Sequence, residues 1–397
     1  MIRRPPYGSV EIFCQSPGKG YERFSSLQKQ KTPIQSCCLV PDNTLTMLAT
    51  EDLIQKFAEK KIPRFRALQV IHAICKEGKS DYSLITTLPG GLKKSLEKEL
   101  PIFSFKLVRS MRSKDGCTEK ALFELHDGLK VEAVLMRFKD NRHTICVSSQ
   151  AGCQLGCTFC ATGTMKFGRN LTYEEIADQV LFFAQKLHAE GTRITNVVFM
   201  GMGEPFMNYD QVMKAVHVMH DPEGLALGAR NITLSTSGIC EGIEKLTEED
   251  LPVNLAVSLH APNQTLRQKI MPIARKYSLE QLMAAIKNYL KVTRRRVSYE
   301  YVMLKGINDG EKEAYELADL IKGQLCHVNL IPYNATDIKG IEGSQKNNIR
   351  RFCDILLEKR IAATIRVTLG QDIAAACGQL ANKEIKMSRS DSKITNS

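Results

Sequence analysis

Three cysteines lie close together in the stretch "SSQAGCQLGCTFCATG", which spans residues 148–163. Three residues separate Cys153 from Cys157, and two separate Cys157 from Cys160. A structural zinc site usually has four ligands, often as two CxxC pairs, so this spacing favours another use. Three thiolates can bind three irons of a [4Fe–4S] cube and leave the fourth iron open to a further ligand. The alternative is a structural zinc site that a distant His or Cys completes.

The elements around these cysteines follow a regular alternation. Apolar, β-branched runs are separated by helical patterns, and the clearest helix begins at a capping box of Thr172 and Glu175 and ends at Gly191. Such alternation predicts a parallel sheet covered by helices, here an α/β partial barrel. The runs are HTICVSS, ITNVVFM, NITLSTS, VNLAVSLH, VSYEYVML, HVNLIPYN and AATIRVT.

Polar residues follow almost every one of these runs. In barrels of alternating strands and helices, the working residues lie at the carboxyl ends of the strands. We therefore expect the three cysteines, the "GMGEP" turn and the later polar residues to share one rim. Along HTICVSS, Ile145 and Val147 share one face and Cys146 has the other, so Cys146 can face the barrel interior.

The composition is that of a soluble globular protein, with 43% apolar and 25% charged residues in 397. No apolar run is long enough to cross a membrane. The formal net charge of +12, from 55 Lys+Arg against 43 Asp+Glu, favours a polyanionic partner such as RNA. The 13 cysteines are an odd number and no secretory signal is visible, so we expect a reducing, cytoplasmic location.

The chain divides into five segments by pattern. We expect a disordered leader at 1–46, for which an organelle transit peptide is the alternative because it is basic and poor in acids. A small N-terminal helical domain (47–103) and a β-hairpin extension around "HDG" (104–141) come next. The core barrel (142–381) and a disordered tail (382–397) follow.

Several motifs together resemble the RlmN/Cfr family of radical S-adenosylmethionine (SAM) RNA adenine methyltransferases. They are CVSSQAGCQLGCTFCATGTM, NVVFMGMGEPFMN, ITLSTSG, LAVSLHAP, IMPIARKY, YEYVML, NLIPYN and GQDIAAACGQL. The resemblance spans roughly residues 48–381 and is greatest to the dual-specificity RlmN type, which methylates adenine carbon 2. It implies a radical SAM partial barrel, a [4Fe–4S] cluster and two SAM molecules per turnover.

The resemblance also assigns site residues. Cys153, Cys157 and Cys160 would bind the cluster, Cys377 would be methylated, and Cys146 would form a transient disulfide with it. Glu132 would be the proton acceptor, although the segment from Glu132 to Cys146 is slightly longer than in the family's pattern. The remaining matches would contact SAM: Gly203, Glu204, Ser235, Ser258, Leu259, His260 and Asn334.

The resemblance further implies the partners. These are 23S rRNA in the peptidyl transferase region, tRNA, and an electron donor such as flavodoxin or ferredoxin, with the enzyme acting as a monomer away from membranes. Two alternatives stay open. One is a Cfr-type enzyme that methylates adenine carbon 8 and gives antibiotic resistance. The other is a non-catalytic RNA-binding protein with a structural metal.

Overall fold

A computed structural model describes residues 49–336 and 338–381 of the chain, which belong to one compact unit. The predicted leader at 1–46 and the predicted tail at 382–397 lie outside the described residues. Within the described parts, no helix has the length and apolar character needed to cross a membrane.

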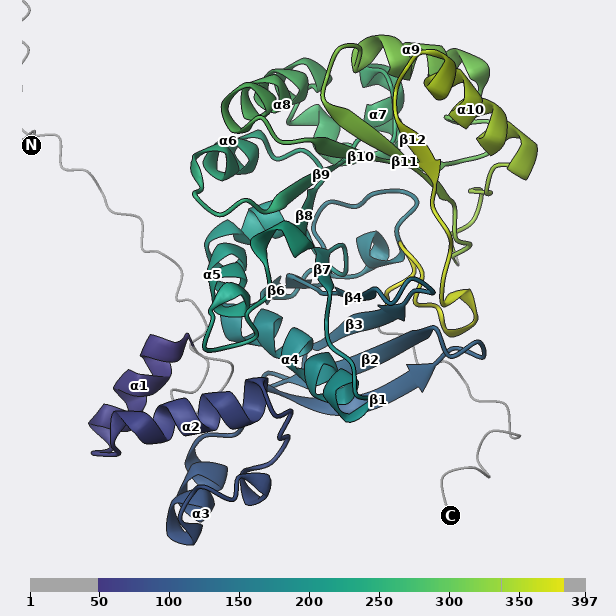
Figure 1. The fold of residues 1–397 in the computed structure, drawn as a ribbon. Helices are drawn as coiled ribbons and strands as arrows, with labels where there is room; N and C mark the ends of the chain where they lie inside the picture. The colour runs from purple at the N-terminus through teal and green to yellow at the C-terminus, as the bar shows by residue number, and fades with distance from the viewer. Residues whose placement is uncertain (1–48, 337, 382–397) are drawn as a thin grey trace, which may run out of the picture. The chain divides into compact units, whose positions relative to one another are not determined.

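One ten-stranded sheet organises the described residues, in the order β1-β2-β3-β4-β7-β8-β9-β10-β11-β12 (Figure 1). Strands β1 to β4 pair antiparallel, and every pair from β4 to β12 is parallel. The strands are β1 (Phe105–Arg112), β2 (Thr118–Leu125), β3 (Lys130–Arg137), β4 (His143–Cys146), β7 (Asn196–Phe199), β8 (Ile232–Thr236), β9 (Asn254–Ser258), β10 (Val297–Met303), β11 (Cys326–Pro332) and β12 (Ala363–Ile365). A separate short pair consists of β5 (Gln150–Ala151) and β6 (Arg169–Asn170).

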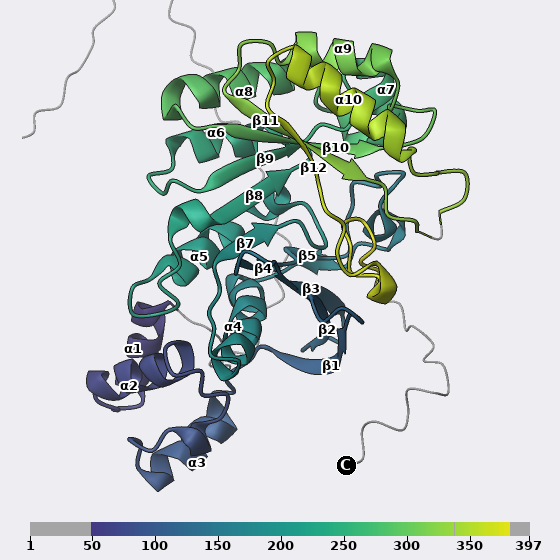
Figure 2. The ribbon, with the colours of Figure 1, turned by 45° about the vertical axis from the view of Figure 1, so that its right-hand side comes forward.

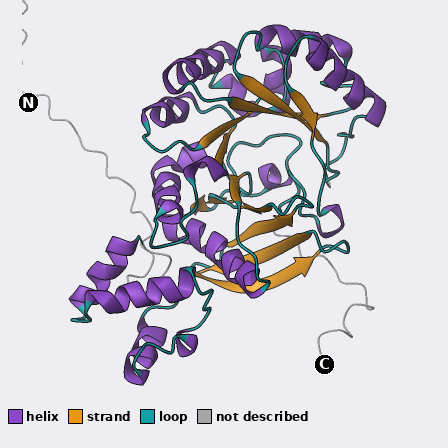
Figure 3. Cartoon of the chain, viewed as in Figure 1, coloured by secondary structure: helices purple, strands orange, loops and turns teal. Residues whose placement is uncertain are grey.

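The parallel strands coincide with the seven β-branched runs, which confirms the partial barrel. Helices lie on the outer side of the curved sheet (Figures 2 and 3). They are α4 (Tyr173–Ala189), α5 (Tyr209–His220), α6 (Cys240–Glu248), α7 (Gln264–Ile270), α8 (Leu279–Thr293), α9 (Glu311–Leu320) and α10 (Lys346–Glu358). Short 3₁₀ turns are η1 (Tyr82–Leu84), η2 (Ala161–Thr164), η3 (Pro205–Asn208), η4 (Ala229–Asn231), η5 (Pro272–Arg275) and η6 (Gln371–Ile373).

Helix α4 shows why these segments are helical. The Thr172 hydroxyl accepts a hydrogen bond from the Glu175 amide, and the Glu175 carboxylate accepts one from the Thr172 amide, as the capping box predicts. The apolar stripe on the helix is fully buried against the sheet at Ile176, Val180 and Phe183. Burying side chains of this size contributes about 1.5–3 kcal/mol each, so the stripe holds the helix on the barrel.

The N-terminal helices are α1 (Thr50–Glu59), α2 (Arg64–Cys75) and α3 (Gly90–Glu99). The sequence TEDLIQKFAEKKI predicts that Thr50 caps the first helix, and this prediction is wrong. Ala49 occupies the cap position and makes no side-chain cap bond, while the Thr50 hydroxyl donates to Asp221 at the end of α5. Asp52 accepts a hydrogen bond from the Tyr173 hydroxyl at 2.8 Å. A tertiary contact to the barrel helices has therefore replaced the local cap.

The extension before the barrel has one more strand than the predicted hairpin. β2 and β3 form that hairpin around "HDG", and Gly128 donates its backbone N–H to Leu125 O at 3.0 Å. β1 adds an outer antiparallel strand that pairs with β2. Its sequence, FKLVRSMR, has little apolar alternation because most of its side chains are at least partly exposed, so its pattern did not indicate a strand.

Candidate active site

The three clustered cysteines lie on the loop between β5 and η2. Cys160 N donates to Cys157 O at 3.2 Å, and Thr158 N donates to Ile270 O at 3.0 Å, so the loop is fixed to itself and to the end of α7. Cys153, Cys157 and Cys160 all line one cavity of about 170 Å³. The structure thus brings the three predicted ligands to one place at the carboxyl ends of the strands.

Burial controls the ionisation of these thiols. It raises the pKa of Cys153 to about 11, and it also raises the pKa values of Cys157 and Cys160. The nearby charges of Cys160 and Cys153 raise the pKa of Cys157 further. Three thiolates can coexist here only beside compensating positive charge.

Two kinds of metal centre can be compared with this arrangement. Over residues 49–336 and 338–381, no three His, Cys, Asp or Glu side chains converge as ligands of a single ion. An iron–sulfur cube instead takes one thiolate on each of several irons. Three soft thiol donors around one cavity fit such a cluster.

A glycine-rich turn after β7 forms the next wall of this cavity. Gly203 has φ +98°, and a Cβ there would lie 2.5 Å from the Gln150 Cβ, so only glycine fits. Gln150 in turn accepts a hydrogen bond from Glu204 N at 2.9 Å. The turn is therefore pressed against the strand that leads into the cysteine loop.

Glu204 is buried and its carboxylate is held by backbone amides. Oε1 accepts from Phe206 N at 3.0 Å, and Oε2 accepts from Ser237 N at 2.7 Å. Burial raises the pKa of Glu204, whereas the bond from Ser237 lowers it. The carboxylate is thus fixed in direction beside the cysteines, where it can accept a hydrogen bond from a cationic amino group.

Ser235 at the end of β8, and Ser258 and His260 at the end of β9, line the same cavity. His260 Nδ1 accepts from Val302 N at 3.0 Å, and burial lowers the pKa of His260 to about 3, so the ring is neutral. Leu259 is different, because its side chain is fully buried in the core and lines neither cavity. Leu259 can contribute backbone atoms alone.

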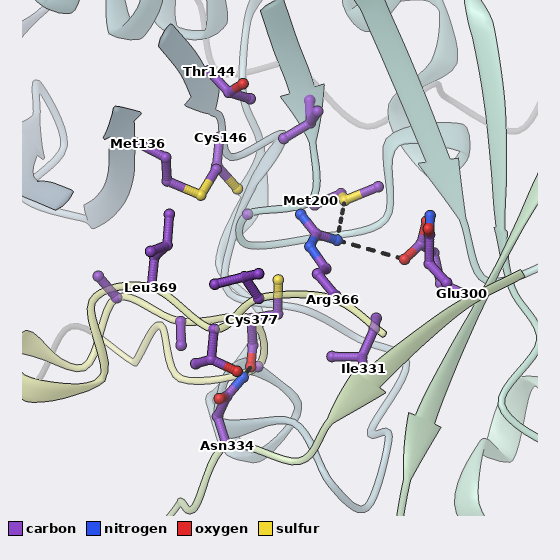
Figure 4. A pocket seen from close by; sticks show the side chains of 18 of the residues that line it. Met136, Thr144, Cys146, Met200, Glu300, Ile331, Asn334, Arg366, Leu369 and Cys377 are labelled. Carbon is purple, nitrogen blue, oxygen red and sulfur yellow. Dashed lines mark hydrogen bonds and ion pairs between the residues drawn. The ribbon is translucent and has the colours of Figure 1, made fainter. Parts of the chain in front are cut away.

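A second cavity, of about 480 Å³, adjoins the first and extends into the barrel (Figure 4). Cys146 at the end of β4 lines it, as its strand face predicts, and Cys377 lines both cavities. Both cysteines are free thiols. Asn334, after β11, also lines both cavities and donates from Nδ2 to Cys377 O at 3.1 Å.

The segment that contains Cys377 returns from the last strand to the first part of the sheet (Figure 1). Ala161 N donates to Gly378 O at 2.8 Å, and the Thr162 hydroxyl donates to Leu380 O at 2.6 Å. These bonds join the segment to the 3₁₀ turn that directly follows Cys160. The position of Cys377 relative to the cysteine loop is therefore fixed by backbone contacts.

Glu132 lies apart from the other predicted site residues. Its side chain is buried beneath the same C-terminal segment and lines neither cavity. Glu132 Oε1 is 2.8 Å from Lys120 Nζ, and Oε2 accepts from Ala381 N at 2.9 Å. In this structure Glu132 holds the C-terminal segment, and its predicted role as proton acceptor stays a prediction.

The sequence patterns did not single out Glu300 and Arg366, two charged residues of the second cavity. Glu300 on β10 and Arg366 after β12 both line it, and Arg366 Nη1 is 3.5 Å from Glu300 Oε2. Each is a charge within an apolar, β-branched run, VSYEYVML and AATIRVT. A charged residue inside such a run was the available signal, because buried strands rarely contain unpaired charges.

Comparison with known proteins supports this geometry. Residues 147–318 match the radical SAM superfamily. The chain is 43% identical over 337 residues to the probable dual-specificity RNA methyltransferase RlmN of Symbiobacterium thermophilum, covering 85% of this chain and 90% of the relative. The chain belongs to the RlmN family. A second RlmN, from Thermus thermophilus, is 46% identical over 319 residues, covering 80% of this chain and 89% of the relative.

Other members of the RlmN family and a solved structure agree. The ribosomal RNA large subunit methyltransferase N of Nitrosopumilus maritimus is 43% identical over 343 residues, which cover 85% of this chain and 97% of the relative. The crystal structure of a radical SAM methyltransferase from Sphaerobacter thermophilus superposes with a TM-score of 0.83 at 45% identity, covering 85% of this chain and 98% of that chain. The radical SAM family implies a [4Fe–4S] cluster and SAM, and the three thiols around the smaller cavity fit that cluster.

Proposed function

We propose that this RlmN-family enzyme methylates carbon 2 of an adenine in 23S rRNA, and in tRNA as well, through a methylated cysteine. The observation that supports this proposal is the position of Cys377, which lines both cavities. A thiol placed there can accept a methyl group on the side of the cysteine loop and present it to an RNA base in the larger cavity. The names of the RlmN relatives, which describe dual-specificity and ribosomal RNA methyltransferases, support RNA as the substrate.

The smaller cavity would hold the cofactors. Cys153, Cys157 and Cys160 would bind the cluster, and the rim residues already described would orient SAM, with the Glu204 carboxylate fixed toward its amino group. Once bound, the reduced cluster and SAM supply a 5′-deoxyadenosyl radical. Such chemistry is required because a ring carbon between two nitrogens is too electron-poor to attack a sulfonium methyl group.

Cys377 and Cys146 would perform the group transfer. The Cys377 sulfur bonds to the methyl carbon of one SAM while the carbon–sulfonium bond breaks, and the electron pair stays on the departing sulfur. Methylated Cys377 then gives one hydrogen atom to the 5′-deoxyadenosyl radical derived from a second SAM, which leaves as 5′-deoxyadenosine, and bonds through that carbon to the adenine. The adduct must then lose the ring proton and one electron, which the cluster would take back. The Cys146 thiolate finally attacks the Cys377 sulfur and breaks its bond to the bridging carbon. The electron pair stays on that carbon, which takes up a proton to become the methyl group of the freed RNA, and the two cysteines remain as a disulfide. Both residues are free thiols before this cycle begins.

Glu132 is included in the proposal as the acceptor of the ring proton. To act in that role, the Glu132 carboxylate must first be released from its present contacts. The Ala381 amide and Lys120 both bind the carboxylate, so the C-terminal segment must move before Glu132 can reach a base. Because that segment also contains Cys377, the movement that releases the Glu132 carboxylate would change the position of Cys377 as well.

The substrate adenine must be unpaired and turned out of its stack to reach a thiol inside the barrel. The net charge of +12 supports association with the RNA backbone. We further propose a monomer in the cytoplasm that receives electrons from a flavodoxin or ferredoxin.

Mass spectrometry of nucleosides from 23S rRNA and tRNA, in cells with and without this chain, tests the proposal. We expect 2-methyladenosine to appear only when the chain is present. Appearance of 8-methyladenosine instead would assign the Cfr-type reaction. Absence of both would leave the RNA-binding alternative, which zinc without acid-labile sulfide in anaerobically purified protein would support.

A further inference from the structure

Arg366 is held in a defined place in the cavity that the two reactive cysteines line. Its backbone N donates to Leu330 O at 2.8 Å, which continues the register of β12 with β11. Its guanidinium Nη1 lies 3.5 Å from Glu300 Oε2 and 3.6 Å from Met200 Sδ. Figure 4 shows the side chain in the cavity that Cys146 and Cys377 also line, with its guanidinium toward Met200 and Glu300. The steps proposed above assign Arg366 no role.

Met200 connects Arg366 to Cys146. β7, which Met200 follows, runs parallel to β4, with Val198 opposite Cys146. The Met200 backbone N–H donates to the Cys146 sulfur, while the Met200 side chain contacts Arg366. One residue therefore contacts both the thiol and the cation.

Cys146 needs a positive charge nearby if it is to attack a sulfur, because the thiolate is the nucleophile. Burial raises the pKa of Cys146 to about 12, the charge of Cys377 raises it as well, and the charge of Arg366 lowers it. The groups that face this place are Cys377 from the C-terminal segment, Arg366 from directly after β12, Glu300 from β10 and Cys160 from the cysteine loop. Arg142, from the turn after β3, lines the cavity too, but it is paired with Asp140 at 2.8 Å.

We propose that Arg366 is a positioning residue for product release, whose guanidinium stabilises the Cys146 thiolate, most effectively once Cys377 is bound to carbon and uncharged. Glu300 and Met200 hold the guanidinium in place for this task. The inference rests on the proposed function of the two thiols. The thiols of Cys377 and Cys146 should therefore ionise one after the other, because a single cation beside two thiols favours one thiolate at a time.

The test measures the reactivity of Cys146 without RNA or SAM, so its result is independent of nucleoside analysis. Full-length, cluster-loaded Cys377→Ala protein is treated anaerobically with iodoacetamide from about pH 6 to about pH 10, and modification of Cys146 is quantified by peptide mass spectrometry. Arg366→Met and Arg366→Lys are compared in this background. Arg351→Met is the control, because Arg351 makes the same kind of ion pair, to Glu311 on the surface.

We expect Arg366→Met to slow modification of Cys146 about tenfold near neutral pH and to shift the pH profile upward, the effect of moving a thiol's midpoint by ~1 unit. Arg366→Lys should retain most of the rate, and Arg351→Met should match the parent. Restoring Cys377 should again slow the modification of Cys146 by iodoacetamide. If Arg366→Met does not fold or retain iron, Arg366→Gln replaces it, since its side chain is uncharged but still polar. A folded, uncharged variant with an unchanged pH profile overturns the proposal.

Discussion

Replacing Glu132 with Gln removes one charge from a buried ion pair. The side chains of Lys120 and Glu132 are only 6% and 2% exposed, and their charged atoms are 2.8 Å apart. Loss of one partner in such a pair leaves the other charge buried and costs about 3–5 kcal/mol. We expect the lower end, ~3 kcal/mol, because Lys120 Nζ keeps its bond to Ala374 O at 3.1 Å and Gln keeps an oxygen for Ala381 N.

Thermal unfolding measures this loss. At about 2.1 cal/mol/K of unfolding entropy per ordered residue, a loss of ~3 kcal/mol lowers the Tm by roughly 4 °C. Glu342→Gln is the matched control, because Glu342 pairs with Lys305 at 2.6 Å with both side chains more than half exposed, and it should not shift the Tm measurably. The double change Lys120→Met with Glu132→Leu should recover most of the loss, since no charge is left unpaired. Equal Tm values for Glu132→Gln and Glu342→Gln would refute the reasoning.

The same variant separates two roles of Glu132. As proton acceptor, Glu132 acts after the RNA is bound to Cys377, so Glu132→Gln should keep Cys377 methylation and accumulate an RNA–protein adduct. As an anchor of the C-terminal segment alone, Glu132 acts earlier, so the variant should show reduced Cys377 methylation and no adduct. Peptide mass spectrometry and a denaturing gel with labelled RNA measure the two quantities.

Three further outcomes are expected. Changing any one of Cys153, Cys157 or Cys160 to Ala should abolish cluster binding and reductive cleavage of SAM, because two thiolates rarely retain a cube; cleavage by a single variant would contradict the ligand assignment. Cys146→Ala should trap RNA on the protein, whereas Cys377→Ala should not, as seen on a denaturing gel; full methylation by Cys377→Ala would exclude the mechanism. Because burial lowers the pKa of His260 from 6.5 to about 3, the unfolded chain binds more protons between these values and stability falls as pH drops below 6.5. Between pH 7 and pH 5 this titration lowers the free energy of unfolding by ~2 kcal/mol. In denaturant titrations, His260→Asn should therefore lose less stability over this pH range than the parent. His72→Gln is the control, because His72 is exposed, and it should lose as much as the parent.

Much of the barrel was predictable because it depends on local pattern. The β-branched runs marked each parallel strand, and Thr172 with Glu175 marked the start of α4. The polar residues at the strand ends were found for the same reason, since parallel strands present their carboxyl ends at one rim. Leu259 shows the limit of matching whole motifs, because alternation alone places it opposite Ser258 and toward the core.

Pairings between distant segments could not be read from pattern. The hairpin register sets Leu122 opposite Glu132, which makes Lys120 a diagonal neighbour, but only the folded sheet shows that both are buried. Thr50 had the sequence of a helix cap, and its contact with Asp221 depends on where α5 ends. Arg366 gave a signal as a charge in an apolar run, yet Glu300, its partner, lies two strands away in the sheet.

The backbone bonds that fix Cys377 have a consequence for synthesis. The cysteine loop is complete at Cys160, whereas Cys377 is added 217 residues later, the difference between the two numbers. At about 5–20 residues per second, a ribosome needs on the order of 10–40 s for that interval. During this time Ala161 and Thr162 have no C-terminal segment to bind, and Asn334 is itself added late in the interval. If Cys377 carries the methyl group as proposed, a growing chain gains the capacity to modify RNA only when the last part of the barrel has been made and has folded back.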